Sequence, residues 1–402
     1  MGSSRREVVT GLGTSLGAGI AALALARGST SALAQQAAPA DVLGAASAAE
    51  RELKIVNIEA LEDEARKALS PGRFAVMGPA GDGWTYRENR RAFNDFPIMA
   101  QRLRSVGDDA IDLRTKLLGL DLTLPVFTAP TGGQGYIHVN GELPNAIGTG
   151  LAGTLFVASG ASNKPLEDIG KATTGPKWFQ IYMNRDMEIN RWLVQRAKAA
   201  GYSAIVLTAD ALGPGQSDDY IRLGRPVQPD LRPGNHDPAL GGRGNFRDFK
   251  RDLSFNDIGF LREASGLPVV VKGLINPEDV RLSLAEGAAA IWISNHGGRQ
   301  MDGVPASITA LRAAVDEVAG RVPVVLDSGV RRGIDVFKAL AIGATAVAIG
   351  RPALWGMALG GAAGVKGVYG QLAGELRAAM LLSGTAKVGD ISRRHVVLPK
   401  AA

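Results

Sequence analysis

The feature that most constrains the fold is a repeated pattern of short apolar runs, each followed by a polar or glycine-containing turn and then a helical stretch. Runs this apolar are typical of parallel strands buried on both faces. The eight runs are Leu124–Ala129, Leu155–Ser159, Trp178–Tyr182, Ala204–Ala209, Pro268–Lys272, Ala290–Ser294, Pro323–Asp327 and Thr345–Gly350. Helical stretches between them include Met187–Ala200, Asn276–Glu286, Ile308–Ala319 and Gly333–Ile342. Eight β/α units predict a TIM barrel. The rival, two doubly wound domains, lacks a GxGxxG turn after an early strand.

The ends of these runs predict where the active site lies, because active residues of a TIM barrel occupy the carboxyl ends of its strands. Nearly every run ends in a polar or otherwise unusual residue, and a complete ring of such ends is much rarer than a single one. The residues at these ends are Ala129, Pro130, Thr131, Ser159, Gln180, Tyr182, Thr208, Asp210, Lys272, Ser294, His296, Asp327, Gly350 and Arg351.

The stretch ISNHGGRQMDG, residues 293–303, combines three residue types that suit one kind of chemistry. Histidine, here His296, is the side chain best able to move a proton near neutral pH. Arg299 could grip a carboxylate or phosphate with two parallel hydrogen bonds. The glycines between them allow a ligand to approach the backbone. The pattern indicates a site that holds an anion and moves its proton, whereas the plainer alternative is a polar turn after a strand.

Two later turns are typical of a phosphate site. The segment 327–333, DSGVRRG, leads from the seventh run into a helix, and Gly350-Arg351 follows the eighth. Glycines such as Gly329 let backbone N–H groups face an anion, while a helix N-terminus and Arg331 add positive charge. Lys272, at the end of an apolar run, needs an anionic partner when buried, and a reduced flavin would be one. Ordinary glycine-rich loops are the alternative interpretation.

Composition excludes several classes of function. The 402 residues contain no cysteine, so disulfides, thiolate nucleophiles and cysteine-based metal sites are excluded, and no histidine–carboxylate cluster has metal-ligand spacing. The net charge is +6, but the basic residues are scattered and not interleaved with aromatic residues. We therefore expect no nucleic-acid partner.

The N-terminus reads as a separate segment. Arg5-Arg6 precedes an uncharged stretch rich in glycine and alanine, and Ala32-Leu33-Ala34 has the form of a cleavage site. This resembles a twin-arginine (Tat) signal peptide, although a basic tail or an uncleaved anchor would also fit the pattern. We expect a signal peptide at 1–34, a flexible linker at 35–50 and the barrel domain at 51–402, with export of the folded protein to the periplasm.

Several motifs resemble those of the FMN-dependent α-hydroxy acid oxidoreductases, a family that includes lactate oxidase, glycolate oxidase and mandelate dehydrogenase. The most specific are SNHGGRQMDG (294–303), LPVVVKG (267–273), DSGVRRGIDVFKALAIGA (327–344) and AIGRP (348–352), supported by WFQIYM (178–183) and VLTAD (206–210). The resemblance extends from about Leu53 to His395 and is strongest to lactate oxidase. It implies an enzyme with tightly bound FMN, a small-molecule substrate and a homotetrameric assembly. Oxygen, a quinone or an electron carrier would accept the electrons.

The resemblance also implies roles for individual residues. His296 would be the base, Asp210 would hold its ring, Arg299 would pair with the substrate carboxylate, and Tyr182 would lie at the substrate hydroxyl. Lys272 would lie beside flavin N1. The remaining flavin contacts would come from Ala129, Pro130, Thr131, Ser159, Gln180, Thr208 and Ser294 at the ring, and from Asp327, Gly329, Arg331, Gly350 and Arg351 toward the phosphate.

Two positions depart from the family pattern. Where the family has a carboxylate-binding tyrosine, this chain has Ala75, and where a second arginine follows the VLTAD segment, it has Ser217. Either Arg222 or Arg225 could replace that arginine. The segment 211–257 is too long for an ordinary loop, and we expect it to cover the flavin as a lid; a surface insertion is the alternative. The acidic pair Asp218-Asp219 would then lie beside the substrate, where it would repel a second anion and attract an amine.

The sequence favours a flavoenzyme that oxidises a 2-hydroxy acid larger than lactate, and two other functions are alternatives. Enzymes that resemble inosine-monophosphate dehydrogenase share the phosphate signature but need a catalytic cysteine, which this chain lacks. An exported FMN-binding protein with a changed substrate class, such as an amine or peptide, or with lost turnover, is the second alternative. Retention of His296 and Asp210 argues against lost turnover.

The signal-peptide interpretation predicts that replacing Arg5 and Arg6 together by lysine keeps the precursor in the cytoplasm, because the Tat pathway requires the arginine pair. Cell fractionation followed by mass spectrometry of the mature N-terminus measures both export and cleavage after Ala34. The double variant should accumulate uncleaved in the cytoplasm, and its appearance in the periplasm as the mature form would contradict the prediction.

Overall fold

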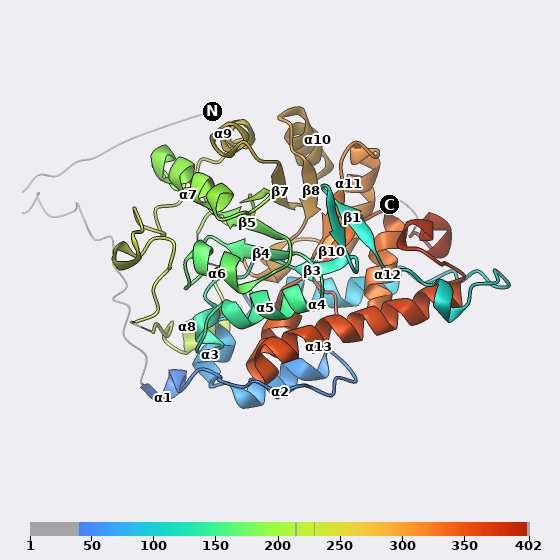
Figure 1. The fold of residues 1–402 in the computed structure, drawn as a ribbon, viewed down its shortest axis with the longest axis horizontal. Coiled ribbons are helices and arrows are strands. Elements are labelled where there is room, and N and C mark those ends of the chain that lie inside the picture. The colour runs from blue at the N-terminus through green and yellow to red at the C-terminus, as the bar shows by residue number, and fades with distance from the viewer. Residues whose placement is uncertain (1–39, 214, 229, 400–402) are drawn as a thin grey trace, which may run out of the picture. The chain divides into compact units, whose positions relative to one another are not determined.

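The computed structural model describes residues 40–399 except 214 and 229, and its strands form the predicted barrel (Figure 1). Eight parallel strands close in the order β10-β3-β4-β5-β6-β7-β8-β9. Their bounds are β3 Val126–Thr128, β4 Phe156–Ser159, β5 Lys177–Ile181, β6 Ile205–Thr208, β7 Val269–Leu274, β8 Ala290–Ile293, β9 Val324–Leu326 and β10 Ala346–Ile349. Each strand lies within or overlaps one of the eight apolar runs, so the barrel prediction is confirmed.

Helices surround the strands, and the four expected from the sequence are present (Figure 1). The helices are α5 Leu143–Leu151, α6 Leu166–Ala172, α7 Met187–Ala199, α9 Asn256–Ser265, α10 Pro277–Ala285, α11 Ser307–Val318, α12 Gly333–Ile342 and α13 Arg351–Ser383. Local signals explain where some begin: the side chain of Asp186 caps α7, and that of Asn276 caps α10, which has Pro277 in its first turn. None of the described helices is long and apolar enough to cross a membrane.

The barrel interior is filled by one buried cluster of side chains. Phe127 lies edge-to-face against Trp178 and Trp292, with ring centroids 6.1 and 5.3 Å apart. The antiparallel hairpin of β1 (Thr115–Leu117) and β2 (Leu120–Leu122) adds Leu117 and Leu122 to the same cluster. The interior is therefore a packed core, and a ligand can approach the strands only at their ends.

The chain before the barrel forms short helices that pack on its outside. They are α1 Ala40–Leu43, α2 Ala60–Ala68, α3 Pro71–Ala75, α4 Trp84–Arg91, and the 3₁₀ turns η1 Ala92–Asp95 and η2 Asp108–Ala110. The expected signal peptide lies outside the described residues. The expected linker is described only from Ala40, and there Ser47 donates a hydrogen bond of 2.6 Å to the carbonyl of Ala358 on α13.

The segment 211–257 crosses the carboxyl ends of several strands. It contains α8 Asp218–Arg222 and η4 Pro238–Leu240. The N–H of Gly234 donates to the Ser162 carbonyl after β4, and the N–H of Lys250 donates to the Met183 carbonyl after β5, both at 2.8 Å. The other 3₁₀ turns are η3 Gln134–Tyr136, η5 His296–Gly298, η6 Val388–Asp390 and η7 Arg393–His395. The described part of the segment is thus attached to neighbouring barrel loops, as a cover over the strand ends requires.

Candidate active site

The strand alternation explains why the candidate site residues converge. Successive residues of a strand face opposite sides, so two residues after an inward core residue the chain faces inward again. The core cluster contains Phe127, Val157, Trp178, Val206, Val270, Trp292, Val325 and Ala348. Two positions further on are Ala129, Ser159, Gln180, Thr208, Lys272, Ser294, Asp327 and Gly350. One sequence-predicted residue from every strand therefore joins a ring at the carboxyl end of the barrel.

Charged and polar side chains of this ring contact one another. Lys272 is 3% exposed, and its ammonium donates a hydrogen bond of 2.9 Å to Ser294 Oγ. It lies 3.8 Å from Asp210 Oδ2 and 3.6 Å from Asp327 Oδ2. On the other side of the ring, Ser159 Oγ donates to Gln180 Oε1 over 2.9 Å. The charge of Lys272 on β7 thus interacts with carboxylates that follow β6 and β9.

His296 and Asp210 form the hydrogen bond expected of a base and its partner. His296 Nδ1 lies 2.8 Å from Asp210 Oδ1, and the His296 side chain is 14% exposed. His296 has a φ of +58°, a left-handed conformation that is unfavourable for a residue with a side chain. The hydrogen bond from the His296 N–H to Ser294 Oγ, 3.0 Å long, supports this turn. With Nδ1–H donating to the carboxylate, Nε2 keeps its lone pair and can accept a proton.

The protonation states follow from burial and neighbouring charge. Burial lowers the pKa of His296, and the positive charge of Lys272 acts in the same direction, although the Asp210 carboxylate partly opposes them. Burial alone would raise the pKa of Asp210, but Lys272 and His296 hold it below its ordinary value. Burial also acts to lower the pKa of Lys272, which the carboxylates of Asp210 and Asp327 raise instead. Near pH 7 the site therefore holds a neutral imidazole beside an ionised carboxylate and an ammonium.

Tyr182 follows β5 and lies against aromatic side chains of the lid segment. Its ring centroid is 6.1 Å from that of Phe246 and 5.8 Å from that of Phe249. Burial raises the pKa of Tyr182 to about 12, so its hydroxyl stays protonated and can donate a hydrogen bond. The sequence analysis missed these two phenylalanines; their only signal was that they are aromatic residues within a segment otherwise rich in glycine and charge.

The structure brings the two departing positions to the turn that contacts Arg299. Arg299 Nη1 donates to the Gly78 carbonyl over 3.0 Å, and the Gly78 N–H donates to the Ala75 carbonyl over 2.9 Å. A Cβ at Gly78 would lie only 2.7 Å from Ser217 Oγ. Ala75 and Ser217 thus both lie beside the turn that Arg299 contacts, and their correspondence to the absent tyrosine and arginine stays a prediction.

The lid residues proposed as replacements or as acidic neighbours are engaged with one another. Arg222, whose side chain is 69% exposed, pairs with Asp219 at 3.1 Å and with Asp218 at 3.4 Å. Arg225 donates to Gln216 Oε1 over 3.2 Å and is partly exposed. Both carboxylates are thus paired with Arg222, and the expectation that they attract an amine substrate stays a prediction. Neither arginine contacts the Arg299 turn in this conformation.

Two arginines follow β9 and β10, the last two strands of the barrel. Arg331 follows β9 and is 94% buried, while Arg351 begins α13 after Gly350. Arg351 donates to the carbonyls of Met77 at 2.8 Å and Gly297 at 2.7 Å. Burial first, and then the charges of Arg299 and Arg331, lower the pKa of Arg351 to about 9. A group of buried positive charges of this kind favours a bound anion.

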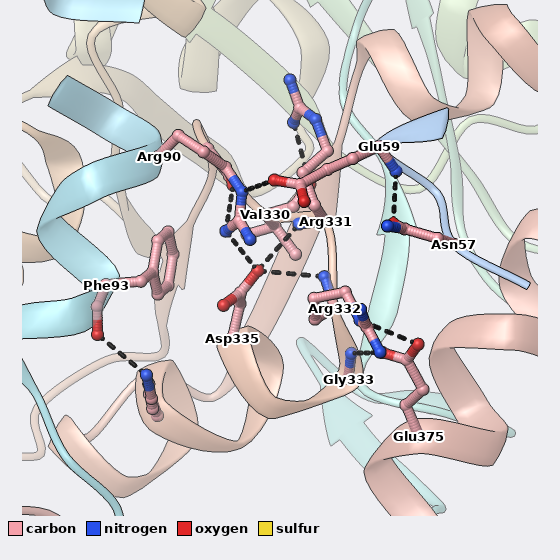
Figure 2. A network of polar contacts seen from close by, with 12 residues as sticks. Asn57, Glu59, Arg90, Phe93, Val330, Arg331, Arg332, Gly333, Asp335 and Glu375 are labelled. Carbon is pink, nitrogen blue, oxygen red and sulfur yellow. Dashed lines mark hydrogen bonds and ion pairs between the residues drawn. The ribbon is translucent and has the colours of Figure 1, made fainter. Parts of the chain in front are cut away.

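A polar network that the sequence analysis missed holds the loop carrying Arg331 (Figure 2). Asp335 Oδ2 accepts hydrogen bonds from the backbone N–H groups of Arg331 at 3.0 Å and Arg332 at 2.9 Å. Arg90 Nη1 lies 2.7 Å from the same oxygen and also donates to the Gly329 carbonyl at 3.3 Å. Gly329 has a φ of +82°, and a Cβ there would overlap the Asn89 carbonyl, so this position favours glycine. These contacts join residues far apart in the chain, so no local sequence pattern predicts them.

Several buried polar atoms of the ring have no hydrogen-bond partner within the described residues. They are Gln180 Nε2, Thr208 Oγ1, Asp210 Oδ2 and Arg351 Nη2. A buried polar group without a partner is unfavourable by about 1–3 kcal/mol. Donors and acceptors at the ring, together with arginines at one end, fit a ligand with a polar aromatic head and a phosphate. This is the composition of FMN, so the residues present fit that cofactor.

Comparison with known proteins identifies relatives along most of the chain. The FMN-dependent dehydrogenase family pattern matches residues 65–398. L-lactate oxidase of Lactobacillus jensenii is 38% identical over 351 residues, covering 86% of this chain and 86% of the relative. Glycolate oxidase 3 of Oryza sativa subsp. indica is 39% identical over 355 residues, covering 85% and 96%.

Solved structures agree with these sequence relatives. The lactate oxidase of Pediococcus acidilactici superimposes with a TM-score of 0.84 at 36% identity, covering 90% of this chain and 99% of that one. A mandelate oxidase with bound (S)-2-phenylpropionate gives a TM-score of 0.78 at 33% identity, covering 86% and 98%.

The His296–Asp210 pair predicts the effect of Asp210→Asn on the histidine. Because the carboxylate raises the pKa of His296 against burial, its neutralisation should lower that pKa further. NMR titration of the labelled imidazole measures the pKa directly, and His296→Gln identifies its signal among the four histidines. The control Asp218→Asn removes a carboxylate that pairs with Arg222 instead, and should leave the titration unchanged. An unchanged or raised pKa in Asp210→Asn would show that the pair does not act as described.

Proposed function

The chain belongs to the family of FMN-dependent dehydrogenases, and we propose that it oxidises a 2-hydroxy acid, or a related compound larger than lactate, to the 2-oxo product with His296 as the base. It is an enzyme that uses FMN, a small-molecule substrate and an electron acceptor, as its relatives among the α-hydroxy acid oxidases do. The observation that carries the proposal is the 2.8 Å contact between His296 Nδ1 and Asp210 Oδ1 beside buried Lys272.

The ring residues would hold the cofactor. Gln180 and Thr208 would offer their unpartnered atoms to the flavin ring, and Lys272 would place a positive charge beside it. Arg331 and Arg351 would hold the phosphate. When bound, FMN would supply at its N5 an acceptor for the hydride, that is, the α-hydrogen with its two electrons, that leaves the substrate.

His296 would take the proton of the substrate hydroxyl at Nε2. Its lowered pKa keeps the imidazole neutral and ready to accept a proton near pH 7. The imidazolium that forms is then stabilised by Asp210, which stays ionised because Lys272 and His296 lower its pKa. Tyr182 would donate a hydrogen bond to the substrate, and Arg299 would bind the carboxylate or carbonyl beside the reacting carbon.

The proposal of a larger substrate rests on what surrounds Arg299. Of three groups expected to bind a small carboxylate, only Arg299 is present, because Ala75 and Ser217 occupy the other two positions. A lost hydrogen bond to a charged group weakens binding by roughly 1.5–3 kcal/mol. Alanine also leaves more room than tyrosine. Related mandelate oxidase structures contain (S)-2-phenylpropionate and, in one variant, 2-hydroxy-phenylacetamide, so a site of this family can accommodate a phenyl group.

Two further properties stay proposals. Export through the Tat pathway is supported by Arg5-Arg6 and the site ending at Ala34. A homotetramer is supported by family resemblance. The alternative function, an exported FMN-binding protein that acts on an amine or peptide or has lost turnover, keeps as its support the two altered carboxylate-binding positions.

Loss of the base should separate flavin binding from flavin reduction. We expect His296→Ala to retain FMN, because His296 does not contact the arginines of the phosphate end, and to slow flavin reduction by substrate about 100- to 10,000-fold. Anaerobic stopped-flow absorbance measures the reduction, and the flavin-to-protein ratio measures retention. His395→Gln, which changes a histidine of η7 outside the site, is the control and should leave flavin reduction unchanged. Reduction at the wild-type rate would remove His296 from the mechanism.

Restoring the absent groups should improve the turnover of a small substrate. We expect Ala75→Tyr combined with Ser217→Arg to raise kcat/KM for L-lactate by about a hundredfold or more, since each of the two charged hydrogen bonds contributes on the order of 1.5–3 kcal/mol. Thermal unfolding should accompany the kinetics, because a larger side chain at buried Ala75 can destabilise α3. Saturation of the natural protein by sub-millimolar L-lactate would contradict the proposed substrate. An effect of Arg222→Gln on lactate binding would then assign the missing contact to Arg222.

A further inference from the structure

Helix α4, which lies outside the barrel, contacts the arginine-rich end of the site. Tyr86 and Arg90 are four residues apart and so lie on one side of this helix. Arg90 holds the backbone of the loop after β9 through the Gly329 carbonyl and through Asp335, and Figure 2 shows its contact with Asp335. Tyr86 contacts the side chains of the arginines themselves. One helix therefore supports both the loop and the charges that it carries.

The arginines at this end are not neutralised by the protein. Within the described residues, neither Arg331 nor Arg351 forms an ion pair with a carboxylate. Arg351 Nη2 is buried and has no hydrogen-bond partner. Without a ligand, like charges of this kind repel one another, so something must hold them in place.

Tyr86 contacts two of these guanidinium groups in different ways. The Arg351 guanidinium carbon lies 4.6 Å from the Tyr86 ring centroid, within the range of a cation–π contact. Arg331 Nη2 donates to the Tyr86 hydroxyl at 3.4 Å, and its guanidinium also lies 4.7 Å from the Trp355 ring centroid. The ring of Tyr86 thus positions one arginine and its oxygen positions the other.

Glu62 fixes the direction of the Tyr86 hydroxyl. The hydroxyl donates to Glu62 Oε2 on α2, and burial raises the pKa of Tyr86, which keeps the phenol neutral near pH 7. With its proton directed to Glu62, the Tyr86 oxygen presents a lone pair to Arg331. The carboxylate thereby orients a neutral acceptor toward Arg331 without itself pairing with that arginine.

We propose that Tyr86 is a positioning residue for the cofactor phosphate: it orders Arg331 and Arg351 so that they can bind a phosphate monoester at the end of the strand ring. The inference rests on the proposed placement of the FMN phosphate at these two arginines. It extends the cofactor site beyond the barrel strands to α4 and, through Glu62, to α2.

Two flavins that differ only in the phosphate test this role. Full-length apoprotein is titrated with FMN and with riboflavin, and the quenching of flavin fluorescence gives both dissociation constants. We expect Tyr86→Phe, which removes the hydrogen bond from Arg331 but keeps the ring, to weaken FMN binding about tenfold, and Tyr86→Leu, which also removes the ring face, about a hundredfold. Riboflavin binding should change by less than about twofold in each. Trp84→Phe is the matched control, since this aromatic residue of the same helix is 47% exposed.

Each outcome decides one part of the proposal. If wild-type apoprotein binds FMN no more tightly than riboflavin, the phosphate does not lie at Arg331 and Arg351, and the placement fails before Tyr86 is considered. If wild type prefers FMN and both Tyr86 variants keep that preference, Tyr86 does not position the arginines. Equal loss for both flavins would show a general structural role and would also overturn the proposal.

Discussion

The ammonium of Lys272, buried inside the end of the barrel, is the interaction on which the rest of the site depends. A buried charge is tolerated only when opposite charges and hydrogen bonds surround it. Here Asp210 lies 3.8 Å away, Asp327 lies 3.6 Å away, and Ser294 accepts its hydrogen bond. Because Asp210 is kept ionised in this way, it can hold His296 in the orientation that leaves Nε2 free. In the proposed function, this fixed positive charge would lie beside the flavin ring.

Much of this arrangement could be predicted from the sequence because it depends on patterns among neighbouring residues. Buried parallel strands require continuous apolar runs, and alternation along each strand places the residue two positions after a core side chain on the inner side again. Gln180, Thr208 and Lys272 were therefore recognisable as members of one ring. The turn that contains His296 was recognisable from its glycines and its neighbouring arginine.

Other parts depend on contacts between distant segments, which no local pattern encodes. In sequence, Arg90 and Asp335 are typical of a solvated helix surface. Only folding brings them together beside the loop that carries Arg331. Tyr86 likewise has no distinguishing neighbours in sequence. The expected role of Asp218 stays a prediction, and its partner was likewise not evident from composition: Arg222 lies 3.4 Å away, one helical turn later. The sequence shows which charged residues exist, but only the fold determines which of them pair with one another.

The division of labour within the chain has an evolutionary consequence. Residues of the ring lie at or just after the ends of the strands that close the barrel, so the sheet and its packed core fix their positions. Ala75 and Ser217 belong to α3 and the start of α8, which lie outside the closed sheet. Such positions can mutate while the barrel keeps its stability. Descendants of one ancestral flavoenzyme could thus acquire new specificities through these peripheral segments while inheriting the redox machinery intact.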